Sequence, residues 1–190
     1  MRTARRQVTD AVTFDRRGWL PGVRAEPSPN FDARPVVAVD LLVIHNISLP
    51  PGEFGSGDVF ALFGNRLEPA AHPFYREIEG LRVSAHFVIE RDGRVTQCVS
   101  IFDRAWHAGV SSWQGRERCN DFSVGIELEG TDDCAFTASQ YAALDRLAGQ
   151  LVASLPLRGA AGHSDIAPGR KTDPGPHFDW ARLTAIPRLV

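Results

Sequence analysis

The stretch FSVGIELEG, residues 122–130, decides the fold of this chain. Because side chains alternate along a strand, Val124, Ile126 and Leu128 share one face, while Glu127 and Glu129 share the other. Apart from these two carboxylates the stretch is apolar. It therefore predicts a central strand of a sheet.

The two glutamates on this strand need a physical reason, because burying a carboxylate without a partner is costly. In one interpretation they face solvent or pair with arginines. In the other, Glu127 is a general base held near a water molecule on a metal ion. The strand by itself leaves both interpretations open.

Strands and helices alternate along the rest of the chain. Residues 36–46 predict the first strong strand, and residues 84–99 predict a hairpin that turns at Asp92-Gly93. The clearest helix covers residues 138–155. Thr137 and Gln140 form a capping box at the start of this helix. The remaining predictions are loops at 48–57 and 108–121, a short helix capped by Asp58, and a last helix near His177.

This order of elements predicts an α/β fold, with a single domain and a mixed central β-sheet flanked by helices. We place the domain at residues 18–190 and an N-terminal arm at residues 1–17, with irregular chain continuing to about residue 36. A chain of 190 residues is long enough for one sizeable core and short for two.

Composition narrows the class of protein. The chain has 21 basic and 23 acidic residues and no basic block, which argues against a nucleic-acid or membrane partner. Its three cysteines show no CxxC spacing and are typical of reduced thiols. The N-terminus lacks an apolar segment of the kind that export signals carry. We therefore expect a cytoplasmic protein that is a monomer.

A metal site is suggested by GHSDIAPGRKTDPGP, residues 162–176, together with His45. His45 ends the apolar run at residues 41–44, and the later segment, which we expect to be a loop and not a regular helix, brings His163 and Asp173. Two histidines and a carboxylate suit Zn²⁺ and leave a fourth position for water. Taken singly, each residue also has a plainer interpretation, as a strand-end histidine or a turn residue.

The other histidines are weaker candidates. We interpret His86 and His107 as structural residues, or as residues that contact ligands, and we do not expect either to bind a metal. His72 and His177 lie next to prolines and are predicted to be exposed.

Five long motifs resemble one known family. They are HNISLPPGEFG, LRVSAHFVIERDG, RAWHAG, QGRERCNDFSVGIELEGTD and GHSDIAPGRKTDPGPHFDWAR, in matching order from about Gly18 to Arg182. The chain resembles the cytosolic, zinc-dependent 1,6-anhydro-N-acetylmuramyl-L-alanine amidases of cell-wall recycling. Their wider superfamily includes phage amidase-type lysozymes and peptidoglycan recognition proteins.

The resemblance implies roles for five residues. It implies one Zn²⁺ ion held by His45, His163 and Asp173, with Glu127 as the catalytic carboxylate and Lys171 as the charge that stabilises an oxyanion. The implied substrate is a small muropeptide, cut between the lactyl carbonyl of anhydro-N-acetylmuramic acid and the amino group of L-alanine.

Further residues in these motifs are candidates for substrate binding. Arg82, Arg118 and Arg170 suit the carboxylates of the stem peptide, because guanidinium groups bind carboxylates bidentately. Asn46 and Trp106 are candidates for the sugar end, or else residues that cap a loop and pack the core.

Two other functions compete with this prediction: an amidase that cleaves polymeric peptidoglycan, and a non-catalytic module that binds its fragments. The complete ligand set and Glu127 favour an enzyme, and the missing export signal favours the recycling role. We also expect the loop at 48–57, with the helix after it, to form one wall of the cleft and to move when substrate binds.

Overall fold

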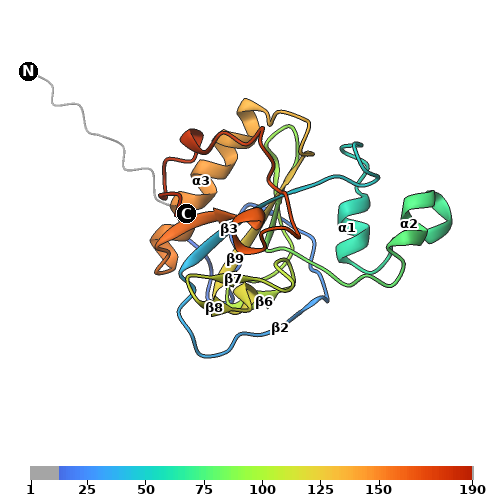
Figure 1. The fold of residues 1–190 in the computed structure, drawn as a ribbon. Coiled ribbons are helices and arrows are strands. Elements are labelled where there is room, and N and C mark those ends of the chain that lie inside the picture. Colours follow the sequence, from blue (N-terminus) through green and yellow to red (C-terminus); the bar gives the residue numbers. More distant parts are fainter. Residues whose placement is uncertain (1–12, 190) are drawn as a thin grey trace, which may run out of the picture.

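The computed structural model describes residues 13–189. At its centre lies a six-stranded mixed sheet in the spatial order β1-β5-β4-β9-β3-β10. Its strands β3 and β9 are labelled in Figure 1. Neighbouring strands run parallel except β4 and β5, which are antiparallel. The predicted α/β domain with a mixed central sheet is confirmed, and the strands are β1 (Arg24–Ala25), β3 (Leu41–Ile47), β4 (Phe87–Ile89), β5 (Val95–Gln97), β9 (Ser123–Glu129) and β10 (Gly159–Gly162).

The predicted central strand is β9. It pairs in parallel with β3 along its whole length and with β4 on its other edge. All seven of its residues are buried, as expected for a strand covered on both faces. The register places His45 of β3 directly opposite Glu127 of β9.

Helix α3 (Ala138–Ser154) covers one face of the sheet (Figure 1). Its start carries the predicted capping box, in which the Thr137 hydroxyl accepts from the Gln140 N–H and the Gln140 side chain accepts from the Thr137 N–H. Leu144, Leu147 and Leu151 of α3 pack with the α3-facing side chains of the central strands in the largest apolar cluster of the described chain. That burial fixes the helix on the sheet.

Two smaller apolar clusters lie away from this core. One joins the helices α1 (Asp58–Phe63) and α2 (Pro73–Glu77) to Val88 and Cys98. The other joins Trp113 and Cys119 to β3 and β10. Short elements complete the fold: β2 (Phe31–Ala33) paired with β6 (Asp103–Ala105), β7 (Ser112–Trp113) paired with β8 (Arg116–Glu117), the one-turn helix α4 (His163–Ile166), and the 3₁₀ turns η1 (Pro69–Ala71), η2 (Cys119–Asp121) and η3 (Trp180–Arg182).

The N-terminal third differs from its prediction in three places. The segment before residue 36 was expected to be irregular, but it supplies β1 at the edge of the main sheet and β2. The strand predicted at 36–46 begins only at Leu41, where the pairing with β9 and β10 starts. Asp58 is the first residue of α1 and not its cap, and its carboxylate accepts from the Tyr75 hydroxyl. The part of the predicted arm at residues 1–12 lies outside the described residues.

The C-terminal half also differs. The predicted loop at 108–121 contains β7, β8 and η2, and the segment at 162–176 is not a loop throughout, because His163 starts the single turn of α4. The Asp165 carboxylate accepts from the Gly162 N–H and closes that turn. The last predicted helix is a 3₁₀ turn at Trp180–Arg182. The hairpin with its turn at Asp92-Gly93 is confirmed.

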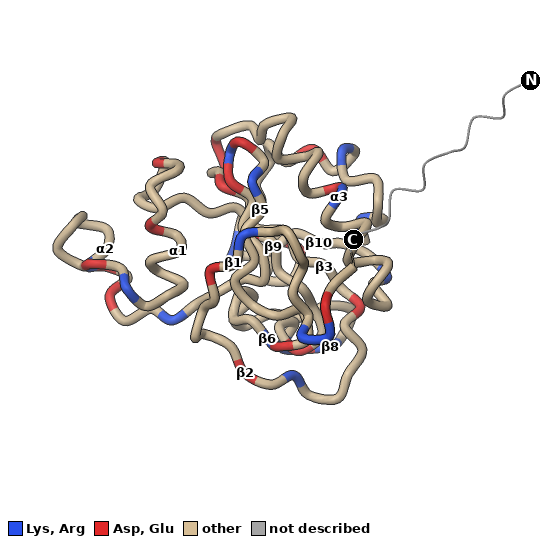
Figure 2. Tube along the Cα trace, turned by 180° about the vertical axis from the view of Figure 1, so that it is seen from behind, with Lys and Arg blue, Asp and Glu red and all other residues tan. Residues whose placement is uncertain are grey.

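Basic and acidic positions lie interspersed along the described trace (Figure 2). Ion pairs such as Arg104 with Asp32 and Asp121, and Arg188 with Asp165, join them locally. Within residues 13–189, no helix combines the length and the hydropathy that crossing a bilayer requires.

Candidate active site

The candidate site lies at one edge of the sheet, where three parallel strands end. His45 lies near the end of β3, Glu127 lies near the end of β9, and His163 directly follows β10. Because β9, β3 and β10 are neighbours and run parallel, their carboxyl ends meet at the same edge. Open α/β sheets commonly bind ligands at this edge.

Three side-chain atoms converge at the centre of the site. His45 Nδ1 lies 3.0 Å from His163 Nδ1 and 3.0 Å from Asp173 Oδ2, and His163 Nδ1 lies 3.1 Å from the same Asp173 oxygen. The histidine side chains are 2% and 4% exposed, and the aspartate is 15% exposed. The residues predicted as metal ligands from the sequence are therefore brought together, with their donor atoms aimed at one point.

This triangle fits a metal ion. A tetrahedral ion with bonds of about 2.0–2.1 Å separates its ligand atoms by about 3.3–3.4 Å, close to the separations found here. The other ring nitrogen of each histidine has its own partner, since His45 Nε2 contacts His107 and His163 Nε2 contacts the Ala108 carbonyl. Ligand histidines in metalloproteins are held in this manner.

Electrostatics also favour unprotonated donor atoms at His45 and Asp173. Burial lowers the pKa of His45 to about 4, with the Asp173 carboxylate opposing this and His163 adding to it. Burial alone would raise the pKa of Asp173, but the close contacts of its carboxylate with the His163 and His45 rings outweigh burial and hold the pKa well below the usual range. Metal ligands must be deprotonated, so both shifts favour binding.

A cleft of about 290 Å³ opens over these atoms. His45, His163 and Asp173, which we call the ligand triangle, line this cleft together with Glu127 and Lys171. Asn46 and Trp106, both predicted to bind substrate, line the same cleft. The rest of the lining is largely apolar and comes mainly from residues 47–83: Ile47, Leu49, Leu62, Phe63, Phe74, Ile78, Leu81 and Val83.

The Glu127 carboxyl is poised in this cleft. Its Oε2 is buried and has no hydrogen-bond partner among the described residues. Burial raises the pKa of Glu127 well above the usual range, and the nearby Asp173 carboxylate adds to this while Lys171 opposes it. A buried carboxyl with a raised pKa in a cleft is a candidate group for taking and returning a proton.

Glu129, two residues along the same face, has a different environment. Its carboxylate accepts from the backbone N–H groups of Gly55 and Arg91. It therefore ties the loop after His45 to the hairpin, and Phe54 of that loop stacks on the Arg91 guanidinium. Glu129 is a structural anchor, and neither glutamate faces bulk solvent, since they are 8% and 6% exposed.

The remaining predicted substrate contacts are spread around the cleft. Arg82 lines a smaller hollow of about 160 Å³ between α1 and α2, which shares Leu62, Ile78 and Leu81 with the main cleft. Arg118 and Arg170 line a third hollow of about 520 Å³. Arg118 is ion-paired with Asp121, and Arg170 donates to the carbonyls of Ala108 and Val110. The Asn46 amide donates to Asp132.

Sequence reasoning missed two residues that support the site. The buried Asn120 side chain accepts from the N–H groups of His107 and Ala108. Gly125 lies against the His107 ring, and a Cβ atom at this position would lie 2.5 Å from His107 Cγ. An isolated glycine inside an apolar strand is a signal of such a close approach, so this second residue was open to prediction.

Comparisons with known proteins agree with this geometry. A family model described as N-acetylmuramoyl-L-alanine amidase matches residues 34–176. The 1,6-anhydro-N-acetylmuramyl-L-alanine amidase AmpD of Escherichia coli K12 is 57% identical over 173 residues, which cover 90% of this chain and 94% of that protein.

Solved structures agree as well. A crystal structure of a selenomethionine derivative of AmpD is similar with a TM-score of 0.87 at 54% identity, covering 92% of this chain and 98% of that one. The Escherichia coli amidase AmiD, solved with the substrate anhydro-N-acetylmuramic acid-L-Ala-D-γ-Glu-L-Lys, is similar with a TM-score of 0.60 at 30% identity, covering 80% of this chain and 57% of that one. The chain therefore belongs to the N-acetylmuramoyl-L-alanine amidase family.

Proposed function

We propose that this chain is a zinc-dependent amidase of peptidoglycan recycling. Its substrates are soluble muropeptides, and it cuts the amide between the lactyl group of anhydro-N-acetylmuramic acid and L-alanine. The observation that carries the proposal is the convergence of His45 Nδ1, His163 Nδ1 and Asp173 Oδ2 on one point of a cleft that Glu127 and Lys171 also line. The names of the similar amidases support the choice of substrate.

His45, His163 and Asp173 are the proposed zinc ligands, because two imidazoles and one carboxylate are a common catalytic donor set for this ion. Zn²⁺ held there would supply a Lewis acid, which polarises a carbonyl group and lowers the pKa of water to about 7. With three protein ligands the ion would keep room for a water molecule, and the scissile amide would lie in the cleft that these residues line.

Glu127 is the proposed proton carrier. The reaction adds water across the C–N bond, with OH going to the lactyl carbonyl carbon and H to the alanine nitrogen. The Glu127 carboxylate would take the proton from the attacking water and return it to the departing amine. Its unpartnered Oε2 and its raised pKa suit both halves of this transfer.

Lys171 is the proposed stabiliser of negative charge on the carbonyl oxygen. It follows α4 and lines the cleft with the ligand residues. An ammonium group at that place acts mainly where charge develops in the transition state, which raises the rate more than it tightens substrate binding.

The cleft and the hollows beside it suggest how the rest of the substrate binds. Trp106 Nε1 is a buried donor without a partner among the described residues, so it is available to a sugar oxygen. Asn46 lines the same cleft. The Arg82 hollow shares lining residues with the cleft, and Arg118 and Arg170 line the hollow on the His163 side, so these arginines are the proposed contacts of stem-peptide carboxylates.

The decisive experiment is mass spectrometry of the products formed from a defined anhydromuramyl tripeptide. We expect anhydro-N-acetylmuramic acid and free tripeptide, and no turnover after a chelator until zinc is restored. Intact tripeptide that stays bound to the protein would indicate a binding module. Faster release of peptide from polymeric peptidoglycan than from the soluble substrate would indicate a wall-lytic enzyme.

Two further expectations from the sequence belong to this proposal. We infer that the enzyme acts in the cytoplasm, where soluble muropeptides are recycled, and that it is a monomer. Cell fractionation and light scattering on the purified protein test these two statements separately.

A further inference from the structure

We propose that His107 is a positioning residue that fixes the tautomer of His45, so that the His45 Nδ1 lone pair faces the metal. The inference rests on the metal centre of the proposed function. His107 is not one of the three proposed ligands, but its side chain contacts one of them, His45.

The argument begins with the hydrogen bonds that lead away from His45. His45 Nε2 lies 3.0 Å from His107 Nδ1, and His107 Nε2 lies 3.3 Å from the Ser123 hydroxyl. The Ser123 hydroxyl in turn donates to the Cys119 carbonyl at 2.6 Å. All three side chains are buried.

The direction of donation is the same in each of these hydrogen bonds. The Cys119 carbonyl can only accept, so the Ser123 hydrogen points to it and the Ser123 oxygen accepts from His107 Nε2–H. A neutral His107 ring that donates from Nε2 must accept at Nδ1. His45 therefore donates from Nε2. Its Nδ1 lone pair faces the Asp173 oxygen and His163 Nδ1, an arrangement of three electron-pair donors that a cation at their centre would satisfy.

The second ligand histidine is fixed by the next residue of the chain. His163 Nε2 lies 3.1 Å from the Ala108 carbonyl, which can only accept, and 3.5 Å from the Arg170 guanidinium, which donates to that same carbonyl at 2.8 Å. The shorter contact assigns the proton to His163 Nε2, so His163 presents its Nδ1 lone pair. The consecutive residues His107 and Ala108 thus orient both ligand rings, one through a side chain and the other through the backbone.

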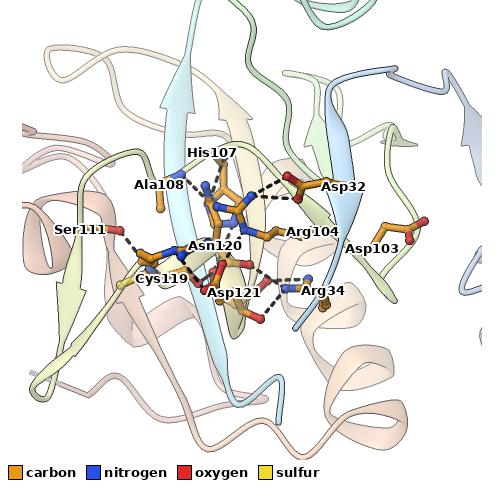
Figure 3. Close-up of polar contacts among 12 residues, drawn as sticks. Asp32, Arg34, Asp103, Arg104, His107, Ala108, Ser111, Cys119, Asn120 and Asp121 are labelled. Atoms are coloured by element: carbon orange, nitrogen blue, oxygen red, sulfur yellow. Dashed lines mark hydrogen bonds and ion pairs between the residues drawn. The ribbon is translucent and has the colours of Figure 1, made fainter. Parts of the chain in front are cut away.

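The dipeptide is itself held in place by Asn120. Asn120 Oδ1 accepts from the His107 N–H at 3.2 Å and from the Ala108 N–H at 2.8 Å (Figure 3). On its outer side, the Asn120 carbonyl accepts from the Arg34 guanidinium at 2.8 Å. Arg104 joins the neighbouring Asp121 to Asp32, so the turn that carries Asn120 is tied to β2 and β6.

The central strand is shaped to receive the His107 ring. A Cβ atom on Gly125 would lie 2.5 Å from His107 Cγ and 2.6 Å from His107 Nδ1, the atom that accepts from His45. The ring crosses His45 edge to face at 5.1 Å between centroids. Any side chain at residue 125 would push this acceptor away from His45.

A core histidine that only fills space would also be buried, so the test must separate packing from hydrogen bonding. His107→Leu places an apolar side chain of similar size at this position and removes the acceptor. His107→Asn keeps an acceptor oxygen near the place of Nδ1. Two measurements are made on each folded variant: the zinc dissociation constant by competition with a chelator of known affinity, and the tautomer of His45 in zinc-free protein by long-range ¹H–¹⁵N NMR.

We expect His107→Leu to bind zinc about 10–100-fold more weakly, the usual effect of losing a partner of a ligand histidine, and to show mixed tautomers at His45. His107→Asn should stay within a few-fold of the unchanged protein and keep the single Nε2–H form. An unchanged zinc affinity and a single tautomer in His107→Leu would overturn the proposal.

A second variant covers the case in which His107→Leu does not fold. Ser123→Ala removes the acceptor of His107 Nε2–H, so it should mix the tautomers of both rings and weaken zinc binding by several-fold, and unchanged values would overturn the proposal equally. A chain that binds no zinc before any substitution would contradict the metal centre. The NMR measurement on zinc-free protein would still decide the role of His107.

Discussion

The two walls of the cleft are built in different ways. We name the side formed by β3, β9 and α4, which carries His45, Glu127 and His163, the sheet wall. We name the side formed by residues 47–83, which carries Leu62, Phe63 and Leu81, the helical wall. The sheet wall belongs to paired strands packed under α3, whereas the helical wall rests on a separate apolar cluster.

This difference suggests separate roles for the two walls: the sheet wall holds the proposed reacting groups, and the helical wall shapes the space for the substrate. Side chains of the sheet wall point from strands whose register is fixed by backbone pairing, and buried hydrogen bonds hold their rings. The helical wall meets the cleft mainly through apolar contacts without fixed direction, and part of it is exposed. Regions with their own small cluster open more readily than a central sheet, so the helical wall is the one suited to adapting to a substrate.

The largest effect should follow from removing a proposed zinc ligand from the sheet wall. We expect His163→Ala to lose both zinc retention and amidase activity, because the two remaining ligands cannot hold the ion firmly. Elemental analysis and product formation measure the two losses. Full zinc content in a folded variant would remove His163 from the ligand set.

Glu127→Gln should keep fold and zinc while slowing turnover by roughly two to four orders of magnitude, as expected when a general base is lost. Glu129→Gln is the matched control on the same strand face. Because the Glu129 carboxylate holds Gly55 and Arg91, we expect a milder effect on kcat there. The reverse order in steady-state kinetics would move the role of base to Glu129.

The exclusion of water from the apolar cluster under the helical wall can be tested by the pH dependence of stability. Burial raises the pKa of the Cys98 thiol to about 12 from 9.0. The thiol therefore adds stability that is complete below pH 9 and is lost as the pH rises toward 12, at about 1.4 kcal/mol per pH unit. Denaturant unfolding at several pH values should show a shallower loss in Cys98→Ala, and Cys134→Ala, at a less buried position, should keep the original slope.

A substitution at Leu81 tests whether the helical wall contributes only apolar contacts with the substrate. Its side chain is 46% exposed and lines the cleft, so Leu81→Ala should change the free energy of unfolding very little. We expect KM to rise by about 3–10-fold, from the loss of apolar contact with substrate, while kcat stays unchanged. A fall in kcat with unchanged KM would mean that this wall takes part in the chemistry.

The smallest effect concerns motion of the helical wall. Ser48, Leu49 and Leu62 line the cleft, so the loop after His45 and the helix α1 do form part of this wall. We predict that a bound product slows hydrogen exchange by a few-fold across residues 48–67. Equal exchange rates in the free and product-bound enzyme would make this segment a fixed scaffold.

An element could be predicted from the sequence where its signal comes from residues that are neighbours along the chain. The alternation in residues 122–130 predicted β9, and the Thr137 and Gln140 pair predicted the start of α3, because both signals come from neighbouring residues. The convergence of His45, His163 and Asp173 was proposed from residue chemistry and from family resemblance.

Features that depend on distant partners were missed. Strand β10 reads GAAG and has none of the β-branched residues that favour strands. It is a strand because β3 pairs with it, and its glycines leave room for Leu189 and Pro174. The bond between Asn120 and the His107-Ala108 backbone was equally out of reach, because an asparagine in a polar loop carries no sign of its partner.

The alignment of His45 opposite Glu127 sets a rule for how this chain tolerates change. Exchanging one apolar residue for another in β3 or β9 alters volume and leaves the pairing in place. Inserting or deleting a single residue between the start of either strand and its functional side chain turns that side chain to the other face of the sheet, toward α3. The number of residues in these two strands is therefore under a stricter constraint than the identity of their apolar side chains.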